Sequence, residues 1–369
     1  MRRRFFAGML TQKAEIVYLF LDRFITTDDA PMTTPRTAEP GPGTWTITDT
    51  GNLASITGGK LVLAGITTGF TDPRLVAGGL SRVVGRALLG TNVMAGASID
   101  TFGTAWRKAT TGGSTNVIHA PYFGNGAMHF WGGAFTSSSV IGVVNGVEYQ
   151  TALVLRSAGC FLLVKGGAYT NWTLAAVSVS PADATLYPSL QHGNSTSTAT
   201  FDAVKVADLP APFTDDYGIV TQRLAGARVA GDAFTHEADC LIEFTATAIP
   251  SANNIDLRFR KQDDTNYWQV TISSTGAITL NEVVGGSATG RGTSAGAVSN
   301  GHRCVIIASD TTIRVYVNNV FKINYVSAVN FKTATAGVLS GEGTGGDVRE
   351  IISWPRTLSG AAKAALDAL

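Results

Sequence analysis

Short runs of apolar, β-branched and aromatic residues recur along the whole chain, and Gly, Asn, Asp and Ser separate them. This pattern is typical of an all-β sandwich, in which strands are short and connections are tight. The clearest runs are residues 60–64, 148–155, 160–165, 239–246, 255–260, 267–273, 278–284, 304–308 and 312–317. Helical periodicity is nearly absent. We expect a helix only over residues 360–369, where Ser359 is placed to cap it.

Length and composition agree with this interpretation. The chain has 369 residues, which suits two domains, and 44% are hydrophobic, enough for a core in each. Its 42 glycines suit many tight turns. Only 15% of residues are charged and the formal net charge is +1, so no overall field would steer it to nucleic acid or to an anionic membrane. We expect neither as a partner.

A long-range repeat predicts that the two domains are similar. Residues 148–172 (EYQTALVLRSAGCFLLVKGGAYTNW) and 301–325 (GHRCVIIASDTTIRVYVNNVFKINY) each read as a strand, a polar turn, a strand, a second turn and an aromatic-bearing strand. Their alignment places Phe161 on Ile313, an offset of 152 residues (313 − 161). A repeat this long indicates a duplicated domain, because solenoid repeats are much shorter. We expect Phe161 and Ile313 to be buried at matching positions of the two cores.

These observations give a domain plan. We expect an N-terminal arm or first strand over residues 1–21, a first sandwich over 22–209, a second sandwich over 215–356 and a tail helix over 357–369. Pro210 and Pro212 stiffen the expected linker, residues 208–214. The first twenty residues imitate a secretion signal, but Gln12, Lys13 and Glu15 interrupt their apolar stretch, so we expect a non-secreted chain.

The second half resembles a known family of domains. The residues that carry the likeness are DLRFRKQDDTNYWQVTISSTGAITLNEVVGG from Asp256, NGHRCVIIASDTTIRVYVNNVFKINY from Asn300 and IISWPRTLSG from Ile351. They are similar to concanavalin A-like, laminin G-like domains over most of residues 215–356. Together with the repeat, the resemblance implies an all-β fold with two antiparallel β-sandwich jelly rolls in tandem, to which the domain plan adds a short N-terminal arm and a short C-terminal helix.

Two further segments suggest a biological setting. The opening, LFLDRFITTDDAPMTTP and GTWTITDTGNLASITGGKLVLAG, and the ending WPRTLSGAAKAALDAL resemble tailed-phage virion proteins, namely minor tail or capsid decoration proteins. This resemblance implies a virion location, other virion proteins as partners, a homo-oligomer and a structural or adhesion role that includes binding to a host-surface glycan. A free-standing carbohydrate-binding module is the first alternative, and a jelly-roll glycoside hydrolase is the second.

One acidic motif bears on the enzymatic alternative. Glu237, Asp239 and Glu243 read E-x-D-x-x-x-E, one residue longer than the E-x-D-x-x-E of laminarinase-type glucanases. On a regular strand the first and last would lie about 20 Å apart, whereas a retaining pair needs about 5 Å. We therefore expect a solvated acidic strand face and no enzyme. The chain also contains no H-E-x-x-H or Walker motif.

The sequence offers weak metal candidates. His119 and His129 could meet across a hairpin, but two imidazoles without a third ligand rarely hold a metal ion. The pairs Asp215–Asp216 and Asp263–Asp264 leave two interpretations open, calcium binding or turn formation. We expect no metal site and no cofactor, with calcium as the only candidate. The odd number of cysteines, Cys160, Cys240 and Cys304, without any C-x-x-C pair, favours buried free thiols.

Sheet faces are the best candidates for a binding site, because sugars bind to aromatic faces with fixed polar groups beside them. Alternation along residues 267–272 places Trp268 toward the core and Tyr267 and Gln269 outward. The same alternation places Arg258 and Arg260 outward on the preceding strand. The six candidate glycan-binding residues are Tyr267, Gln269, Arg258, Arg260, His129 and Trp131. An ordinary half-polar face, or a face covered by a protein neighbour, is the alternative.

Overall fold

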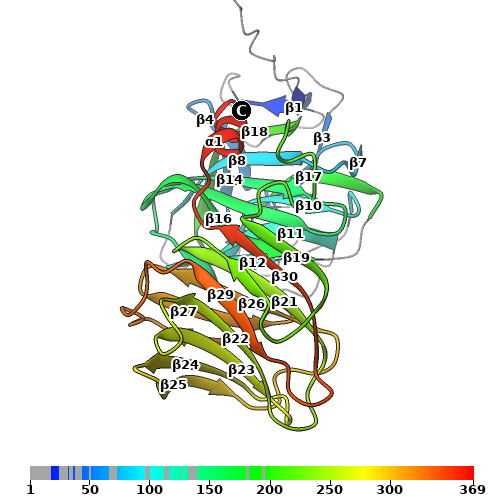
Figure 1. Cartoon of the computed structure of the whole chain (residues 1–369). Helices are drawn as coiled ribbons and strands as arrows, with labels where there is room; N and C mark the ends of the chain where they lie inside the picture. The colour runs from blue at the N-terminus through cyan, green and yellow to red at the C-terminus, as the bar shows by residue number, and fades with distance from the viewer. Residues whose placement is uncertain are drawn as a thin grey trace, which may run out of the picture.

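The expected fold class is confirmed: the chain is all-β, with antiparallel jelly-roll sandwiches in tandem and one short C-terminal helix (Figure 1). A computed structural model describes residues 18–24, 32, 36–37, 44–49, 51–65, 73–95, 100–111, 116–124, 126–131, 139–179, 183–192 and 196–369. The predicted N-terminal arm, residues 1–21, lies outside these ranges up to residue 17. No helix within them is long and apolar enough to cross a membrane.

The first sandwich contains two sheets. In the order of their hydrogen bonding, the described strands of one sheet are β16 (Tyr169–Ser178), β15 (Cys160–Gly166), β14 (Glu148–Leu155), β8 (Arg86–Ala95), β18 (Thr198–Asp208), β5 (Lys60–Ala64) and β4 (Ala54–Thr57), with β1 (Tyr18–Asp22) also paired to β18. Those of the other are β13 (Ser139–Gly142), β12 (Ala127–Trp131), β11 (Val117–Gly124), β10 (Thr104–Arg107), β17 (Thr185–Gln191), β6 (Arg74–Val76), β3 (Thr44–Thr48) and β2 (Arg36–Thr37), with β7 (Leu80–Ser81) on β17 and β9 (Asp100–Phe102) on β11.

The second sandwich also contains two sheets. One has the order β19 (Gln222–Arg228), β30 (Asp347–Pro355), β21 (Cys240–Ala248), β26 (His302–Ser309), β27 (Thr312–Val317) and β28 (Val320–Tyr325). The other has the order β20 (Ala233–Thr235), β29 (Ala336–Gly341), β22 (Asn254–Lys261), β23 (Tyr267–Ser273), β24 (Ile278–Val284) and β25 (Ser287–Ser294). Helix α1 (Gly360–Asp367) follows β30. We call the β20–β29–β22–β23–β24–β25 sheet the outer sheet of the second domain.

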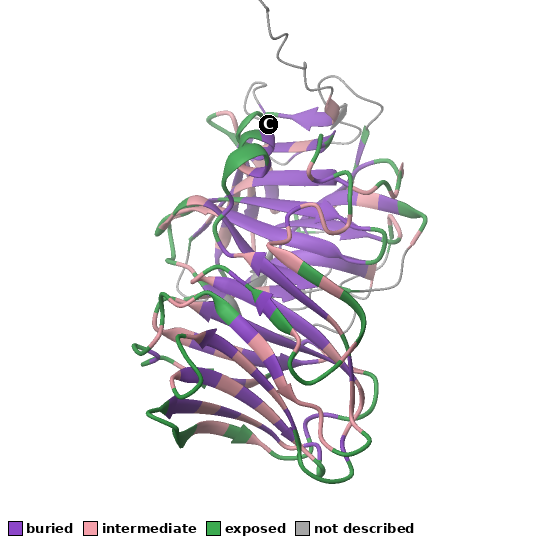
Figure 2. Ribbon diagram, in the orientation of Figure 1, coloured by how far each residue is buried: buried purple, intermediate pink, exposed green. Residues whose placement is uncertain are grey.

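Three apolar layers hold these sheets together. Each sandwich has its own core between its two sheets. A third layer lies between the domains, where β8, β14, β15 and β16 pack against β21, β26, β27 and β30. Its largest side chains include Trp172 and Trp354. Figure 2 shows the buried strands running through the middle of the molecule, with exposed residues mainly in loops and along its outer strands.

The third layer explains why one expectation about the repeat was wrong. Phe161 is 1% exposed, but it lies in the layer between the domains, whereas Ile313 lies in the core of the second sandwich. An offset of 153 residues instead places Cys160 on Ile313, and both of these face a core. A one-residue shift moves every side chain of a strand to the opposite face. Because both faces of these strands are buried, no polar face marks the register.

The C-terminal tail returns to the first domain. The Leu174 N–H donates to the Arg356 carbonyl at 2.6 Å and the Leu358 N–H donates to the Trp172 carbonyl at 2.8 Å, so the tail covers the edge of β16. Leu366 on α1 is then buried in the layer that the first domain shares with the second. An alanine-rich helix this short needs a packing surface, and this chain's own first domain supplies it.

Candidate functional site on the outer sheet of the second domain

The outer sheet brings together three of the six predicted residues. Strands β22 and β23 pair so that Arg258 lies opposite Gln269 and Phe259 lies opposite Trp268. Trp268 is fully buried in the core, and the neighbouring positions Tyr267 and Gln269 therefore face outward, as alternation predicts. Arg258, Tyr267 and Gln269 thus lie side by side on one face. Whether they bind a ligand stays a prediction.

Arg258 and Tyr267 form a stacked pair. The guanidinium carbon of Arg258 lies 4.2 Å from the centre of the Tyr267 ring, so that Tyr267 is only 7% exposed. Within the described residues the Arg258 guanidinium makes no hydrogen bond and no ion pair, and its Nε is buried without an acceptor. The pair therefore presents a positioned cation with unused donors.

A groove of about 580 Å³ runs beside this pair, with Arg258 in its wall. Strand β20 supplies Ala233 and Thr235, and β29 supplies Val338, which lies directly opposite Arg258. These residues were absent from the sequence-based site. They join it only through pairings of β20 with β29 and of β29 with β22, which connect residues far apart in the sequence and leave no local pattern.

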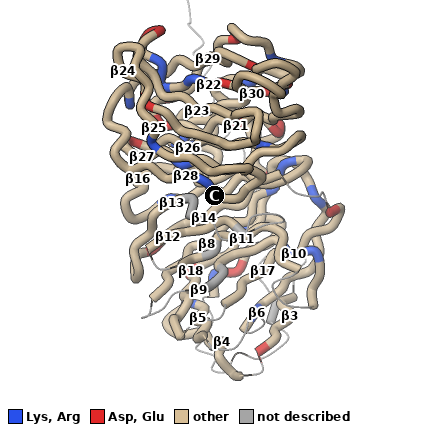
Figure 3. The backbone as a smooth tube through the Cα atoms, turned by 90° about the horizontal axis from the view of Figure 1, so that it is seen from below, with Lys and Arg blue, Asp and Glu red and all other residues tan. Residues whose placement is uncertain are grey.

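Lys261 and Asp264 also contribute to the wall of the groove. Their side chains form an ion pair at 2.8 Å, in which Asp264 is almost fully exposed. The Lys261 ammonium holds the pKa of the Asp264 carboxyl below its ordinary range. Figure 3 shows that both signs of charge occur on the strands of the second domain, so the groove is not set in a field of one sign.

The rest of the face is a closed hydrogen-bond network. Asp256 Oδ1 accepts from Gln269 Nε2 at 2.8 Å and from the Thr271 hydroxyl at 2.7 Å. Asn281 Nδ2 donates to the Thr271 hydroxyl oxygen at 3.3 Å. Asp256, the acid nearest to Arg258 along the strand, accepts these bonds through Oδ1. Gln269 is therefore committed to the sheet itself, and Arg258 is the residue with donors to offer.

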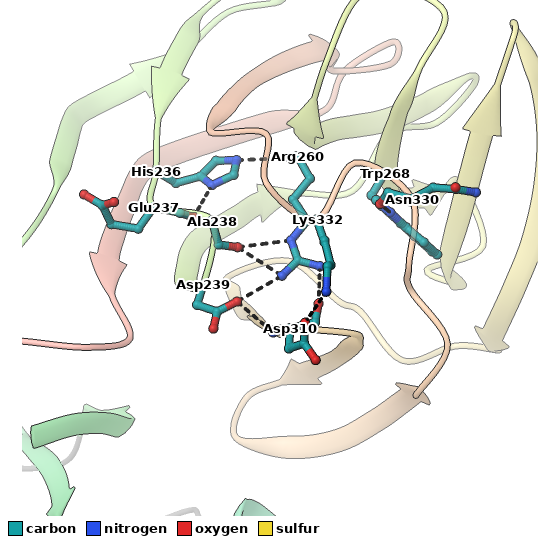
Figure 4. Close-up of polar contacts among 9 residues, drawn as sticks. All are labelled: His236, Glu237, Ala238, Asp239, Arg260, Trp268, Asp310, Asn330 and Lys332. Atoms are coloured by element: carbon teal, nitrogen blue, oxygen red, sulfur yellow. Dashed lines mark hydrogen bonds and ion pairs between the residues drawn. The ribbon is translucent and has the colours of Figure 1, made fainter. Parts of the chain in front are cut away.

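Arg260 does not face outward, in contrast to the sequence-based expectation. The pairing of β22 with β29 shifts register between Arg258 and Lys261, and Arg260 has a φ of 44°. This bulge turns its side chain inward, where it is 0% exposed and donates to the carbonyls of Asp310 at 2.8 Å and Ala238 at 3.0 Å (Figure 4). Burial lowers the pKa of Arg260. It is a structural residue that anchors two loops.

His236 belongs to the same cluster (Figure 4). The Arg260 backbone N–H donates to His236 Nε2 at 3.0 Å, so Nε2 carries a lone pair and the proton lies on Nδ1. Nδ1 lies 2.7 Å from the Glu237 carbonyl, to which it donates. Burial lowers the pKa of His236, and the neutral ring is the form that this cluster holds.

The two remaining candidates lie in the first domain, apart from Arg258. His129 is half-buried on β12, and its imidazole covers Gly124 of the neighbouring strand β11. A Cβ atom added to Gly124 would lie only 3.0 Å from His129 Nε2. Trp131 ends β12, and its side chain is outside the described residues. The structure therefore does not join this pair to the second-domain site.

The acidic triplet is split between two environments, which corrects the expectation of one solvated face. Glu237 and Asp239 precede β21 and line a different cleft, of about 730 Å³, near the start of the tail. Asp239 Oδ1 accepts from the Asp310 N–H at 2.7 Å. Glu243 is buried between the domains and is paired with Arg303. The strand begins only at Cys240, so the three acids never share a strand face.

The two aspartate pairs act in turns and contacts. Asp263 Oδ1 accepts from the Thr265 N–H at 2.8 Å and from Asn266 Nδ2 at 2.9 Å, which shapes the β22–β23 loop. Asp216 Oδ1 accepts from the Ser157 N–H at 2.6 Å and so links the two domains. No group of three potential metal ligands occurs among the described residues.

All three cysteines are free and buried, as expected. Burial raises the pKa of the Cys240 and Cys304 thiols to about 12 and raises that of Cys160 further. These thiols are therefore protonated at neutral pH and are poor nucleophiles. They act as small apolar side chains in the cores.

Comparisons with known proteins gave partial likenesses to solved structures. No family model and no curated protein matches the sequence. Sheep galectin-11 in complex with glycerol is 11% identical, with a TM-score of 0.28 over 34% of this chain and 98% of that one. The carbohydrate-binding module CBM66 from Bacillus subtilis is 11% identical, with a TM-score of 0.24 over 37% and 94%.

The catalytic domain of an endo-1,3-β-glucanase (laminarinase) from Thermotoga petrophila is also 11% identical, with a TM-score of 0.35 over 52% of this chain and 98% of that one. A carbohydrate-binding module and the catalytic domain of an enzyme are thus both among these similar structures. These are likenesses between parts of chains.

Proposed function

We propose that this chain is a non-enzymatic binding protein that holds a glycan in the groove on the outer sheet of its second domain. The observation that carries the proposal is Arg258, a cation stacked on Tyr267 with unused donors beside a groove of about 580 Å³. A concave site with a few fixed polar groups is the usual form of a ligand site. Rigid strands hold both residues, so little order is lost on binding.

Blocking the groove tests this proposal. Ala233 is exposed and lines the groove, so Ala233→Trp should fill it without disturbing the core. Ala227 is an exposed alanine on the edge strand β19, away from the groove, and Ala227→Trp is the matched control. We expect glycan-array binding by wild type and by the control, and loss of binding in Ala233→Trp. Equal binding by both variants would place the site elsewhere.

The absence of glycoside hydrolysis is part of the proposal. It is supported by the burial of Glu243 against Arg303 and by the engagement of Asp239 with the Asp310 N–H. Glu237 is the acid with no such partner among the described residues, so it is the position to test. Turnover of a β-glucan by purified protein that disappears in Glu237→Gln would establish an enzyme and overturn this part.

We also propose a setting in a phage particle, on the tail or the capsid surface, as a homo-oligomer among other virion proteins. This part rests on the resemblance of the opening and closing segments to virion proteins. Detection of the chain in purified virions, together with sedimentation of the isolated protein, tests it. A chain that is absent from virions but binds glycan would be a free-standing carbohydrate-binding module.

A further inference from the structure

We infer that the ligand of this groove carries a carboxylate, so that it is an acidic sugar such as a uronic or sialic acid, and that Arg258 is its anchor. The inference rests on the proposed glycan-binding function and specifies its ligand class. A guanidinium offers five N–H donors, and Arg258 uses none of them in a hydrogen bond to any described residue.

The neighbours of Arg258 cannot take these donors. Its cross-strand neighbours are Val338 and Gln269, which carry no charge. Asp256, two residues away on the same strand, already accepts from Gln269 and Thr271. Asp264, in the wall of the same groove, is paired with Lys261. Arg258 helps to lower the pKa of the Asp264 carboxyl through its charge, but it donates no hydrogen bond to that carboxyl, so its N–H donors are left for a group from outside the chain.

The geometry of the pair favours a planar anion. A guanidinium binds a carboxylate through two parallel N–H···O bonds, and stacking on an aromatic ring fixes its plane. Tyr267 supplies that ring at 4.2 Å. Because Arg258 covers it, Tyr267 has little surface left for a sugar, and its role is to position Arg258. Lys261 provides a second cation in the wall, although Asp264 neutralises it in the free protein.

The test uses a printed array in which each acidic glycan stands beside its neutral partner: sialylated beside asialo glycans, and oligogalacturonates beside their methyl esters. Sulfated neutral glycans form a third set. We expect wild-type protein to prefer the carboxylate members by about tenfold or more, as a charge-assisted bidentate contact implies. Arg258→Gln should abolish the preference. Arg258→Lys keeps the charge but loses the planar fork, and should weaken it.

The outcomes separate the inference from the function on which it rests. Binding to neutral and acidic partners alike, or an unchanged preference in Arg258→Gln, overturns the anchor while glycan binding stands. A preference for the sulfated set overturns the carboxylate assignment. No binding to any glycan refutes the proposed function itself. Circular dichroism and the thermal midpoint of each variant show whether it is folded, and Arg258→Lys provides a second readout if Arg258→Gln is not.

Discussion

Replacing Glu243 by leucine should destabilise the protein, because it would leave Arg303 charged and without its carboxylate between the two domains. Glu243 and Arg303 are each only 7% exposed. Arg303 also donates from Nη1 to Asn319 Oδ1 at 2.8 Å and from Nη2 to the Val177 carbonyl of the first domain at 2.9 Å. The bond to Val177 ties the second domain to β16 of the first, and the ion pair and the Asn319 bond hold the Arg303 side chain in place for it.

The magnitude follows from this geometry. Breaking a buried pair by removing one partner costs about 3–5 kcal/mol, because the other charge stays buried. Since two neutral acceptors remain on Arg303, we expect Glu243→Leu to lie at the lower end, at about 3 kcal/mol. The double variant Glu243→Leu/Arg303→Met replaces both charges by apolar groups in an apolar layer. It should cost about 1 kcal/mol or less, because a hydrophobic replacement of a buried pair is often neutral.

Urea unfolding measures these values. The free energies of the wild type, the two single variants and the double variant form a double-mutant cycle, whose coupling term isolates the pair. Trp172 and Trp354 lie in the layer between the domains, so their fluorescence reports its opening, while circular dichroism reports the strands. A cost below about 1 kcal/mol for Glu243→Leu, or a double variant as unstable as the sum of the single ones, would refute this account of the layer.

Three further predictions concern the second domain and the tail. Ile313 is fully buried, so Ile313→Ala should cost about 2–5 kcal/mol in urea unfolding, whereas the exposed Val326→Ala should change stability by less than about 0.5 kcal/mol. Burial lowers the pKa of His236 below its ordinary 6.5, so that as the pH falls the unfolded chain binds a proton before the folded protein does. The contribution of His236 to the free energy of unfolding should therefore be full above about pH 6.5 and should fall as the pH drops toward the lowered pKa of the folded protein. His236→Gln should flatten this pH dependence. Leu366→Ala should release α1, seen as faster amide exchange over residues 360–367 with little change in the strands.

The sequence predicted the directions of side chains correctly where a strand alternates with a two-residue period and has one polar face. Along β23 the alternation of Trp268 with Gln269 and Tyr267 placed each side chain on its correct face. The same reasoning failed for Arg260, because a bulge adds a residue on one strand and inverts the faces beyond it. A bulge arises from pairing with a distant strand, here β29, and residues 255–260 alone carry no sign of it.

The layer between the domains could not be predicted for a related reason. Ala152, Val154 and Phe161 face the second domain, and they are as apolar as the residues between them that face the first core. A strand that is apolar on both faces indicates burial but not the partner that buries it. The surface that buries the tail helix could not be predicted for the same reason. Its contact with the first domain depends on β16 lying next to the end of β30.

This layer restricts where the chain can meet a ligand. The two middle sheets are buried against each other as well as against their own partners, so their faces cannot bind anything from solution. Only the outward faces of the two outermost sheets, the loops and the free edges remain. On the described part of these surfaces, the second-domain face combines a groove, a stacked arginine with unused donors and a satisfied polar network around it. The tandem packing that removes the inner faces from solvent therefore also favours the outer sheet of the second domain as the place of the proposed binding site.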